Sequence, residues 1–85
     1  MNTFRVWIRP LGCACRVRVD GRENAMWLLA RLGNSLAFNG CEPTRDDEAS
    51  FRSTFQVPYT PQIPRSKLEE LLGAIPQVRL MLEPA

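Results

Sequence analysis

The sequence predicts an α+β fold of the ferredoxin-like type, a βαββαβ sandwich in which one antiparallel sheet carries two helices on one face. Two observations support this class. Apolar and polar residues alternate in several short segments, which is typical of strands with one buried face. Two further segments show the apolar spacing of amphipathic helices. The chain has 85 residues, and we expect residues 1–85 to form a single domain because this length supports one small core.

The first strands are predicted on either side of a loop that contains Pro and Gly. Apolar residues occupy even positions from Phe4 to Ile8 and odd positions from Cys15 to Val19. A shift of one residue turns every side chain of a strand to the other face, so the change indicates two strands joined by a short loop or one strand with a bulge. The two-strand interpretation is favoured, with residues 4–9 as an extra N-terminal strand.

The first helix is expected to begin near Glu23 and to end at Gly33, which suits a C-terminal cap. Asp20 and Glu23 have the spacing of a capping box. The predicted apolar stripe of this helix comprises Ala25, Met26, Leu28, Leu29 and Leu32.

The second half of the chain predicts three strands and one helix. The strands are expected at 35–38, 50–57 and 78–83, and the helix at 66–75, before a proline. The polar segment 41–49 indicates a mobile connection. Its carboxylates at 46–48 fit a solvated loop better than a cation site, since the spaced ligands of a calcium motif are missing.

Composition argues against catalysis, cofactors and metals. The chain contains no His, three Cys and a net charge of +2. Without His it lacks the commonest general base and metal ligand, and Cys13 and Cys15 are spaced too closely for a usual zinc site. An odd number of Cys favours a reducing compartment, so we expect a cytoplasmic protein. No apolar stretch reaches the length of a membrane span, and no membrane partner is expected.

One sheet face is predicted to be cationic, because the polar positions of the strands fall on the side away from the helices. The candidate binding residues on this face are Arg5, Trp7, Arg9, Arg16, Arg18, Arg52 and Arg79, and Thr54, Gln56 and Met81 lie beside them. Three interpretations remain open. The face is only solvated, it contacts a protein or a second copy, or it binds nucleic acid.

The predicted topology resembles that of RNA-recognition domains, which bind RNA on this same sheet face. Their motif places aromatic residues on the two central strands. The central strands are expected to be 15–20 and 78–83, and they present only Arg, Asp, Met and Glu there, which departs from the motif. The topology also resembles that of ACT-type regulatory domains, which bind small molecules near the first strand–helix turn. Here Asp20 and Gly21 agree with theirs, but the usual Pro-Gly is absent.

These observations favour a small non-enzymatic binding or assembly module that self-associates through its sheet as a homo-oligomer. The first alternative is RNA binding on the Arg-rich face, and the partner is then a nucleic acid or an acidic protein. The second alternative is a small-molecule sensing domain.

Overall fold

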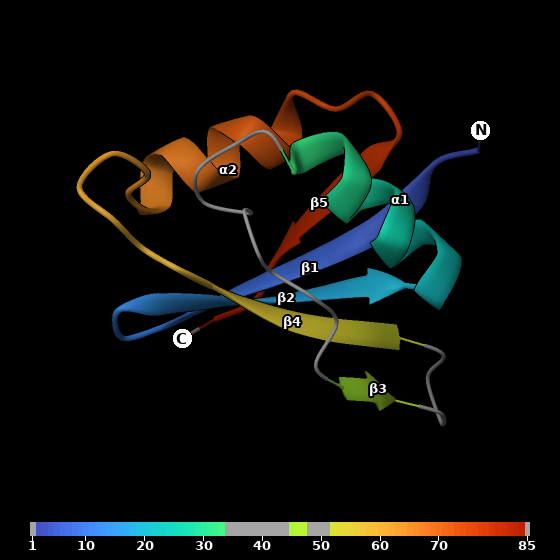
Figure 1. Ribbon diagram of the computed structural model, residues 1–85, viewed down its shortest axis with the longest axis horizontal. Helices are drawn as coiled ribbons and strands as arrows, with labels where there is room; N and C mark the ends of the chain where they lie inside the picture. Colours follow the sequence, from blue (N-terminus) through green and yellow to red (C-terminus); the bar gives the residue numbers. More distant parts are fainter. Residues whose placement is uncertain (1, 34–44, 48–51, 85) are drawn as a thin grey trace.

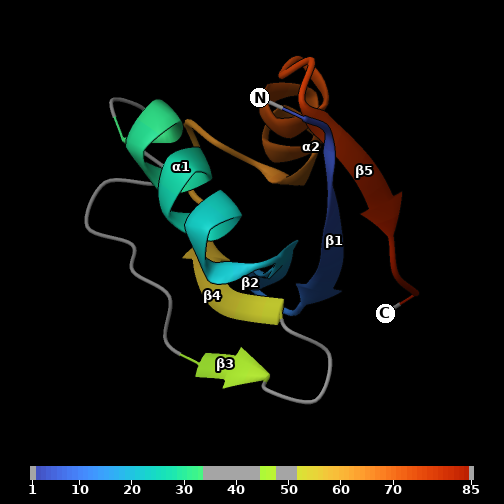
Figure 2. The same ribbon diagram turned by 90° about the vertical axis from the view of Figure 1, so that its right-hand side faces the viewer.

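The computed structural model shows an α+β fold in which a five-stranded mixed sheet carries two helices on one face (Figures 1 and 2). It describes residues 2–33, 45–47 and 52–84. The elements in chain order are β1 (Phe4–Leu11), β2 (Ala14–Asp20), α1 (Arg22–Leu32), β3 (Arg45–Asp47), β4 (Arg52–Pro58), α2 (Arg65–Gly73) and β5 (Val78–Leu82). The strand order is β3-β4-β2-β1-β5. The predicted α+β class and the single helical layer are therefore confirmed.

The segment before Cys15 forms a separate strand, as the change of parity predicted. β1 and β2 pair as an antiparallel hairpin in which Leu11 lies opposite Ala14. The two-residue loop between them contains Gly12, whose φ of 65° lies in the left-handed region that glycine adopts without a steric penalty. The loop restores the register, so even positions of β1 and odd positions of β2 face the same side.

The position of β1 in the sheet differs from the prediction. β1 lies between β2 and β5 and pairs with β5 in parallel. The sheet is therefore mixed instead of antiparallel. Segment 78–83 is not a central strand, because β5 lies at one edge and β1 and β2 are inside the sheet. The short hairpin brings β1 beside β2, so the chain returning from α2 meets the exposed edge of β1.

The polar connection also contains a strand that the sequence did not indicate. Arg45–Asp47 forms β3, which pairs antiparallel with β4 at the other edge of the sheet. An edge strand has only one neighbour, so charged residues are tolerated there. The three charged residues of β3 do not show the alternation of apolar and polar residues by which the other strands were predicted. The prediction of a mobile loop is wrong for these three residues. The strand predicted at 35–38 and the carboxylate of Glu48 lie outside the described residues.

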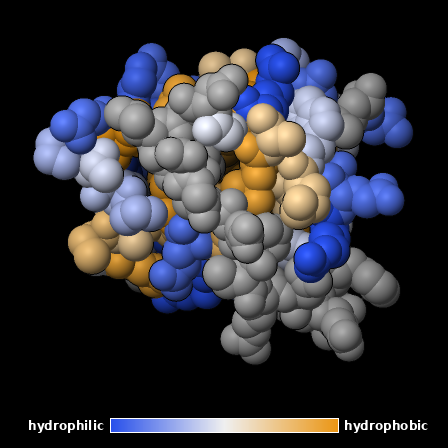
Figure 3. Space-filling model, in the orientation of Figure 1, coloured by the Kyte–Doolittle hydropathy of each residue, from blue (hydrophilic) through white to orange (hydrophobic). Residues whose placement is uncertain are grey.

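The core lies between the helices and the inner face of the sheet. Val6, Val17, Val19 and Phe55 are fully buried there. In the view of Figure 3, apolar groups show near the middle of the molecule and also at its lower left border, and hydrophilic side chains lie along much of the left and right borders. α1 buries Ala25, Leu28, Leu29 and Leu32.

Two apolar side chains are less buried than the pattern of their helix or strand indicates. Met26 was expected in the apolar stripe of α1, but its side chain is 51% exposed. Met26 lies one residue from Ala25, and a helix turns by about 100° per residue, so it points away from the sheet. Leu80 is only partly buried, because it belongs to an edge strand, although it packs against the core.

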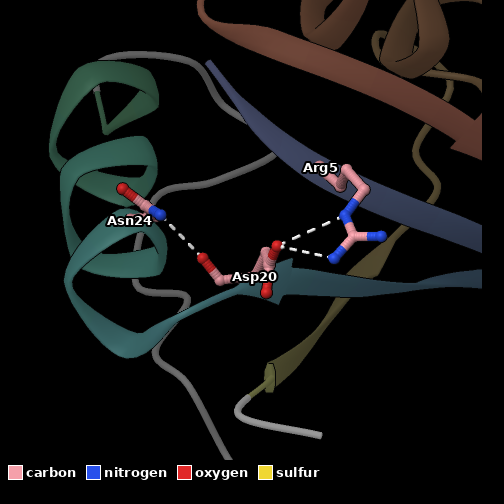
Figure 4. Close-up of polar contacts among 3 residues, drawn as sticks. All are labelled: Arg5, Asp20 and Asn24. Atoms are coloured by element: carbon pink, nitrogen blue, oxygen red, sulfur yellow. Dashed lines mark hydrogen bonds and ion pairs between the residues drawn. The ribbon is translucent and has the colours of Figure 1, made fainter. Parts of the chain in front are cut away.

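The start of α1 shows that Asp20 is not a helix cap. The N-terminal cap is Gly21, with φ 90° and ψ 139°, and no side chain bonds to the first amides of α1. Asn24 instead donates from Nδ2 to the carbonyl oxygen of Asp20 at 2.7 Å (Figure 4). The predicted capping box is wrong because the Asp20 carboxylate lies on the opposite sheet face, where it contacts Arg5.

Replacing Gly21 by alanine is expected to lower the free energy of unfolding by about 1–3 kcal/mol, because non-glycine residues rarely adopt its φ. Gly73→Ala is the matched control. An added Cβ there meets no atom within 4 Å, and Gly73 has no positive φ, so this change should be neutral or slightly stabilising. Urea denaturation followed by circular dichroism measures both. Equal effects of the two substitutions would contradict the left-handed backbone conformation of Gly21.

Candidate functional site

The candidate site is the sheet face that the helices leave uncovered. Its position follows from the strand register, because residues directly opposite each other point to the same side of a sheet. We call this surface the arginine face. It consists of Arg5, Trp7 and Arg9 on β1, Arg16, Arg18 and Asp20 on β2, Arg52, Thr54 and Gln56 on β4, Arg79 and Met81 on β5, and Glu83 just after β5.

The register arranges these side chains in cross-strand rows. One row contains Met81, Trp7, Arg18 and Thr54, from β5 to β4. A second contains Arg9, Arg16 and Gln56. Arg79 lies beside Arg5 at the N-terminal end of β1. All seven residues predicted for the binding face, Arg5, Trp7, Arg9, Arg16, Arg18, Arg52 and Arg79, therefore lie on one surface.

Two of the arginines form ion pairs that the sequence analysis missed. Nε and Nη2 of Arg5 donate to one carboxylate oxygen of Asp20 at 3.3 and 3.2 Å (Figure 4). Nη2 of Arg16 lies 3.3 Å from a carboxylate oxygen of Glu83. Asp20 occupies an even position of β2, like Arg16 and Arg18, so the alternation already placed it on this face. The ion pair with Arg5 was missed because Asp20 was interpreted as a helix cap. Arg16 lies on β2 and Glu83 follows β5, and β1 is the one strand between them. The Arg16 side chain can therefore reach Glu83 across β1.

Trp7 organises two further cations. The guanidinium carbon of Arg52 lies 3.9 Å from the centre of a Trp7 ring, and that of Arg5 lies 5.1 Å from it. Both distances are within the range of cation–π attraction. Arg52 comes from β4, two strands away from β1. The Trp7–Arg52 contact therefore joins β1 to β4 across the arginine face and places an aromatic ring beside two positive charges.

Three arginines of the face have neither an anionic partner nor an aromatic ring beside them among the described residues, whereas Arg5 and Arg16 have carboxylates and Arg52 has Trp7. These are Arg9, Arg18 and Arg79, for which the structure records neither an ion pair nor a side-chain hydrogen bond within those residues. The Nε atoms of Arg9 and Arg18 are buried without a hydrogen-bond partner there. Their aliphatic stems therefore lie against the sheet, as arginine stems commonly do on apolar surfaces. On β1, β2, β4 and β5 and at Glu83, six arginines and two carboxylates give this surface a positive excess. The register of β3 adds one charge of each sign, with Arg45 opposite Thr54 and Asp47 opposite Arg52.

The two cysteines that the structure describes, Cys13 and Cys15, are both free thiols. Cys15 is buried in the core, and desolvation raises the pKa of its thiol above the usual value. A raised pKa lowers the thiolate fraction and so the reactivity. Cys13 is exposed in the hairpin loop, whereas Cys41 lies outside the described residues. Within those residues, no three Cys, Asp or Glu side chains cluster as a metal site would require.

Tyr59 is the only tyrosine of the chain, and its titration tests whether its hydroxyl packs beside Cys15. Desolvation, followed by the neighbouring Cys15, raises the pKa of Tyr59 to about 12. The unfolded chain releases this proton near pH 10. Tyr59 therefore contributes stability that is complete below pH 10 and is lost as the pH rises towards 12. Absorbance at 295 nm should show a midpoint near 12 in the folded protein and near 10 in urea. A folded midpoint near 10 would contradict the packing.

Comparison with known proteins adds no family to this description. No family model, no curated protein and no solved structure matches the chain. Neither α1 nor α2 has the length and hydropathy needed to cross a bilayer, so the described residues contain no membrane-spanning helix. The function must therefore be inferred from the arginine face itself.

Proposed function

We propose that the chain is a non-enzymatic binding module whose arginine face binds single-stranded RNA. The observation that carries the proposal is the group of three unpaired arginines, Arg9, Arg18 and Arg79, on a face that no described helix covers. Guanidinium groups match phosphate oxygens in geometry and charge. A phosphate backbone would supply the anions that the described residues do not.

The position of Trp7 favours RNA over an acidic protein. The objection from sequence was that the central strands lack an aromatic residue, but β1 is itself a central strand and Trp7 faces outward from it. We interpret the sheet as a ferredoxin-like order into which β1 is inserted between β2 and β5. Aromatic rings and guanidinium planes stack on unpaired bases of single strands. Trp7 and Arg52 would supply that surface beside the phosphate-binding arginines.

Electrostatics disfavours pairing of two arginine faces. A face-to-face dimer would bring two cationic surfaces together, because the arginines of each face outnumber its carboxylates. Like charges opposed across an interface weaken association. Self-association is therefore proposed for another surface, described below. The proposal places the protein in the cytoplasm, where reducing conditions keep thiols such as Cys13 and Cys15 free.

Fluorescence anisotropy with a labelled 12-nucleotide oligouridine tests the proposal. If three arginines contact phosphates, the affinity should fall about 15-fold between 50 and 200 mM salt. The matching RNA duplex should bind more weakly, because its bases are not available for stacking. Absence of binding at 50 mM salt would overturn the proposal. Binding of an acidic peptide but not of the oligouridine would replace RNA by a protein partner.

A further inference from the structure

The two edges of the sheet differ in their protection against pairing. The edge strand β3 is only three residues long and carries two aspartates. The edge strand β5 is five residues long, Val78–Leu82, and contains no Lys or Pro. Natural edge strands are usually shortened, charged or interrupted, because an open edge is a template for another strand. β5 has fewer of these protections than β3.

The backbone of β5 offers hydrogen bonds along this edge. The amide of Phe4 donates to the carbonyl of Gln77, and that of Glu83 donates to the carbonyl of Ile8. Bonds in a parallel pair involve alternate residues, so odd positions of β5 face β1. The amides and carbonyls of Leu80 and Leu82 then point away from the sheet. No strand lies beyond β5 among the described residues.

The side chains at this edge are apolar and accessible. Met81 is 45% exposed on the arginine face, and Leu82 is 61% exposed on the opposite face. They are two of the four large apolar side chains that are exposed among the described residues. An edge with unpaired backbone groups and apolar side chains on both faces suits β-strand addition.

We propose that β5 pairs antiparallel with β5 of a second copy, with a two-fold axis at Met81. In this register Met81 lies opposite Met81 of the other copy, and Leu80 lies opposite Leu82. The four available backbone groups of Leu80 and Leu82 in each copy are then all paired. Arg79 lies opposite Glu83 of the second copy, so no like charges are directly opposed, and each Glu83 keeps its ion pair with Arg16 of its own copy. A register centred on Arg79 would oppose two arginines directly, and like charges in that position destabilise a sheet.

Pairing in this register extends the arginine face across both copies. The outward residues of β5 continue the rows of β1, so the two faces join at Met81 without stacking on each other. The interface is a single strand pair, smaller than the standard interface of about 1,600 Å². The association is therefore transient at low concentration. It does not depend on RNA binding.

Cysteine cross-linking tests the register. Met81→Cys and Arg79→Cys are each made in a background of Cys13→Ser and Cys41→Ser, which leaves the buried Cys15. Opposed Met81 Cα atoms would be about 4.5 Å apart, within disulfide range. The two Arg79 Cα atoms would be about 13 Å apart along the strands. Under oxidised glutathione, Met81→Cys should form disulfide dimers at least about tenfold faster than Arg79→Cys. Equal rates would overturn the register.

Sedimentation over a concentration series tests the edge independently. The wild-type protein should show a monomer–dimer equilibrium. Leu82→Lys should abolish the dimer, because it places a charge in the apolar strand pair. Met26→Lys, on α1, is the matched control and should leave the equilibrium unchanged, since Met26 is also exposed. A wild-type protein that stays monomeric up to about 1 mM, where even weak association is detectable, would overturn the proposal. A dimer insensitive to Leu82→Lys would do the same.

Discussion

Replacing Phe55 by alanine is expected to lower the free energy of unfolding by about 3–5 kcal/mol. Phe55 is the largest of the side chains that are fully buried among the described residues. It lies on β4 opposite Val17 of β2. Removing a buried phenyl ring costs its transfer free energy and leaves a cavity. A domain of this length has a total stability of roughly 4–13 kcal/mol, so the variant should lose a large part of it.

Met26→Ala is the matched control for this substitution. Both changes remove a large apolar side chain, but Met26 is exposed. Its loss should change the stability by less than about 0.5 kcal/mol. Urea denaturation of the three proteins measures the difference. A Phe55→Ala effect as small as that of Met26→Ala would show that the inner face is not the core.

Removing the three unpaired arginines together is expected to weaken RNA binding on the order of 100-fold at low salt. The variant carries Arg9→Gln, Arg18→Gln and Arg79→Gln. Each lost phosphate contact removes a charge-assisted hydrogen bond, of which about 1 kcal/mol or more remains after solvation. The slope of log affinity against log salt should also flatten by about 2, since single strands contribute about 0.7 per neutralised phosphate.

A second triple variant separates the face from net charge. Arg31→Gln, Arg65→Gln and Lys67→Gln remove the same charge from α1 and α2, on the other side of the sheet. This variant should retain affinity within about threefold, because its charges lie away from the bound strand. Equal losses in both variants would indicate general attraction of RNA to a cationic protein. Thermal melting confirms that both variants are folded.

The sorting of side chains between the two sheet faces could be predicted from the sequence alone. Alternation has a period of two in a strand, so Val17 and Val19 had to face the same side as each other and opposite to Arg16 and Arg18. Their complete burial confirms this prediction. The helices were also predictable, although the exposed Met26 shows that a pattern near the border of an apolar stripe is ambiguous.

The order of the strands could not be predicted in the same way. Alternation shows which face a residue occupies but not which strand lies next to which. The insertion of β1 between β2 and β5 depends on the two-residue loop around Gly12, which forces adjacent pairing. Strand β3 was missed because its aspartates have a low strand propensity.

The ion pairs of the arginine face could not be predicted from the sequence either, because they depend on the order of the strands. Ion pairs such as Arg16 with Glu83 join strands that are distant in sequence. The pattern predicted six arginines on one face, but it could not separate those with partners from those without. That distinction selects Arg9, Arg18 and Arg79 as the contact residues.

Nuclear magnetic resonance of the arginine side chains tests the central claim most directly. The Nε–Hε signals of the ten arginines are assigned and followed during titration with oligouridine. The signals of Arg9, Arg18 and Arg79 should shift most, because their guanidinium groups gain phosphate partners. Those of Arg31 and Arg65 on the helices should stay unchanged. Shifts confined to the helix arginines, or equal shifts throughout the molecule, would contradict the proposal.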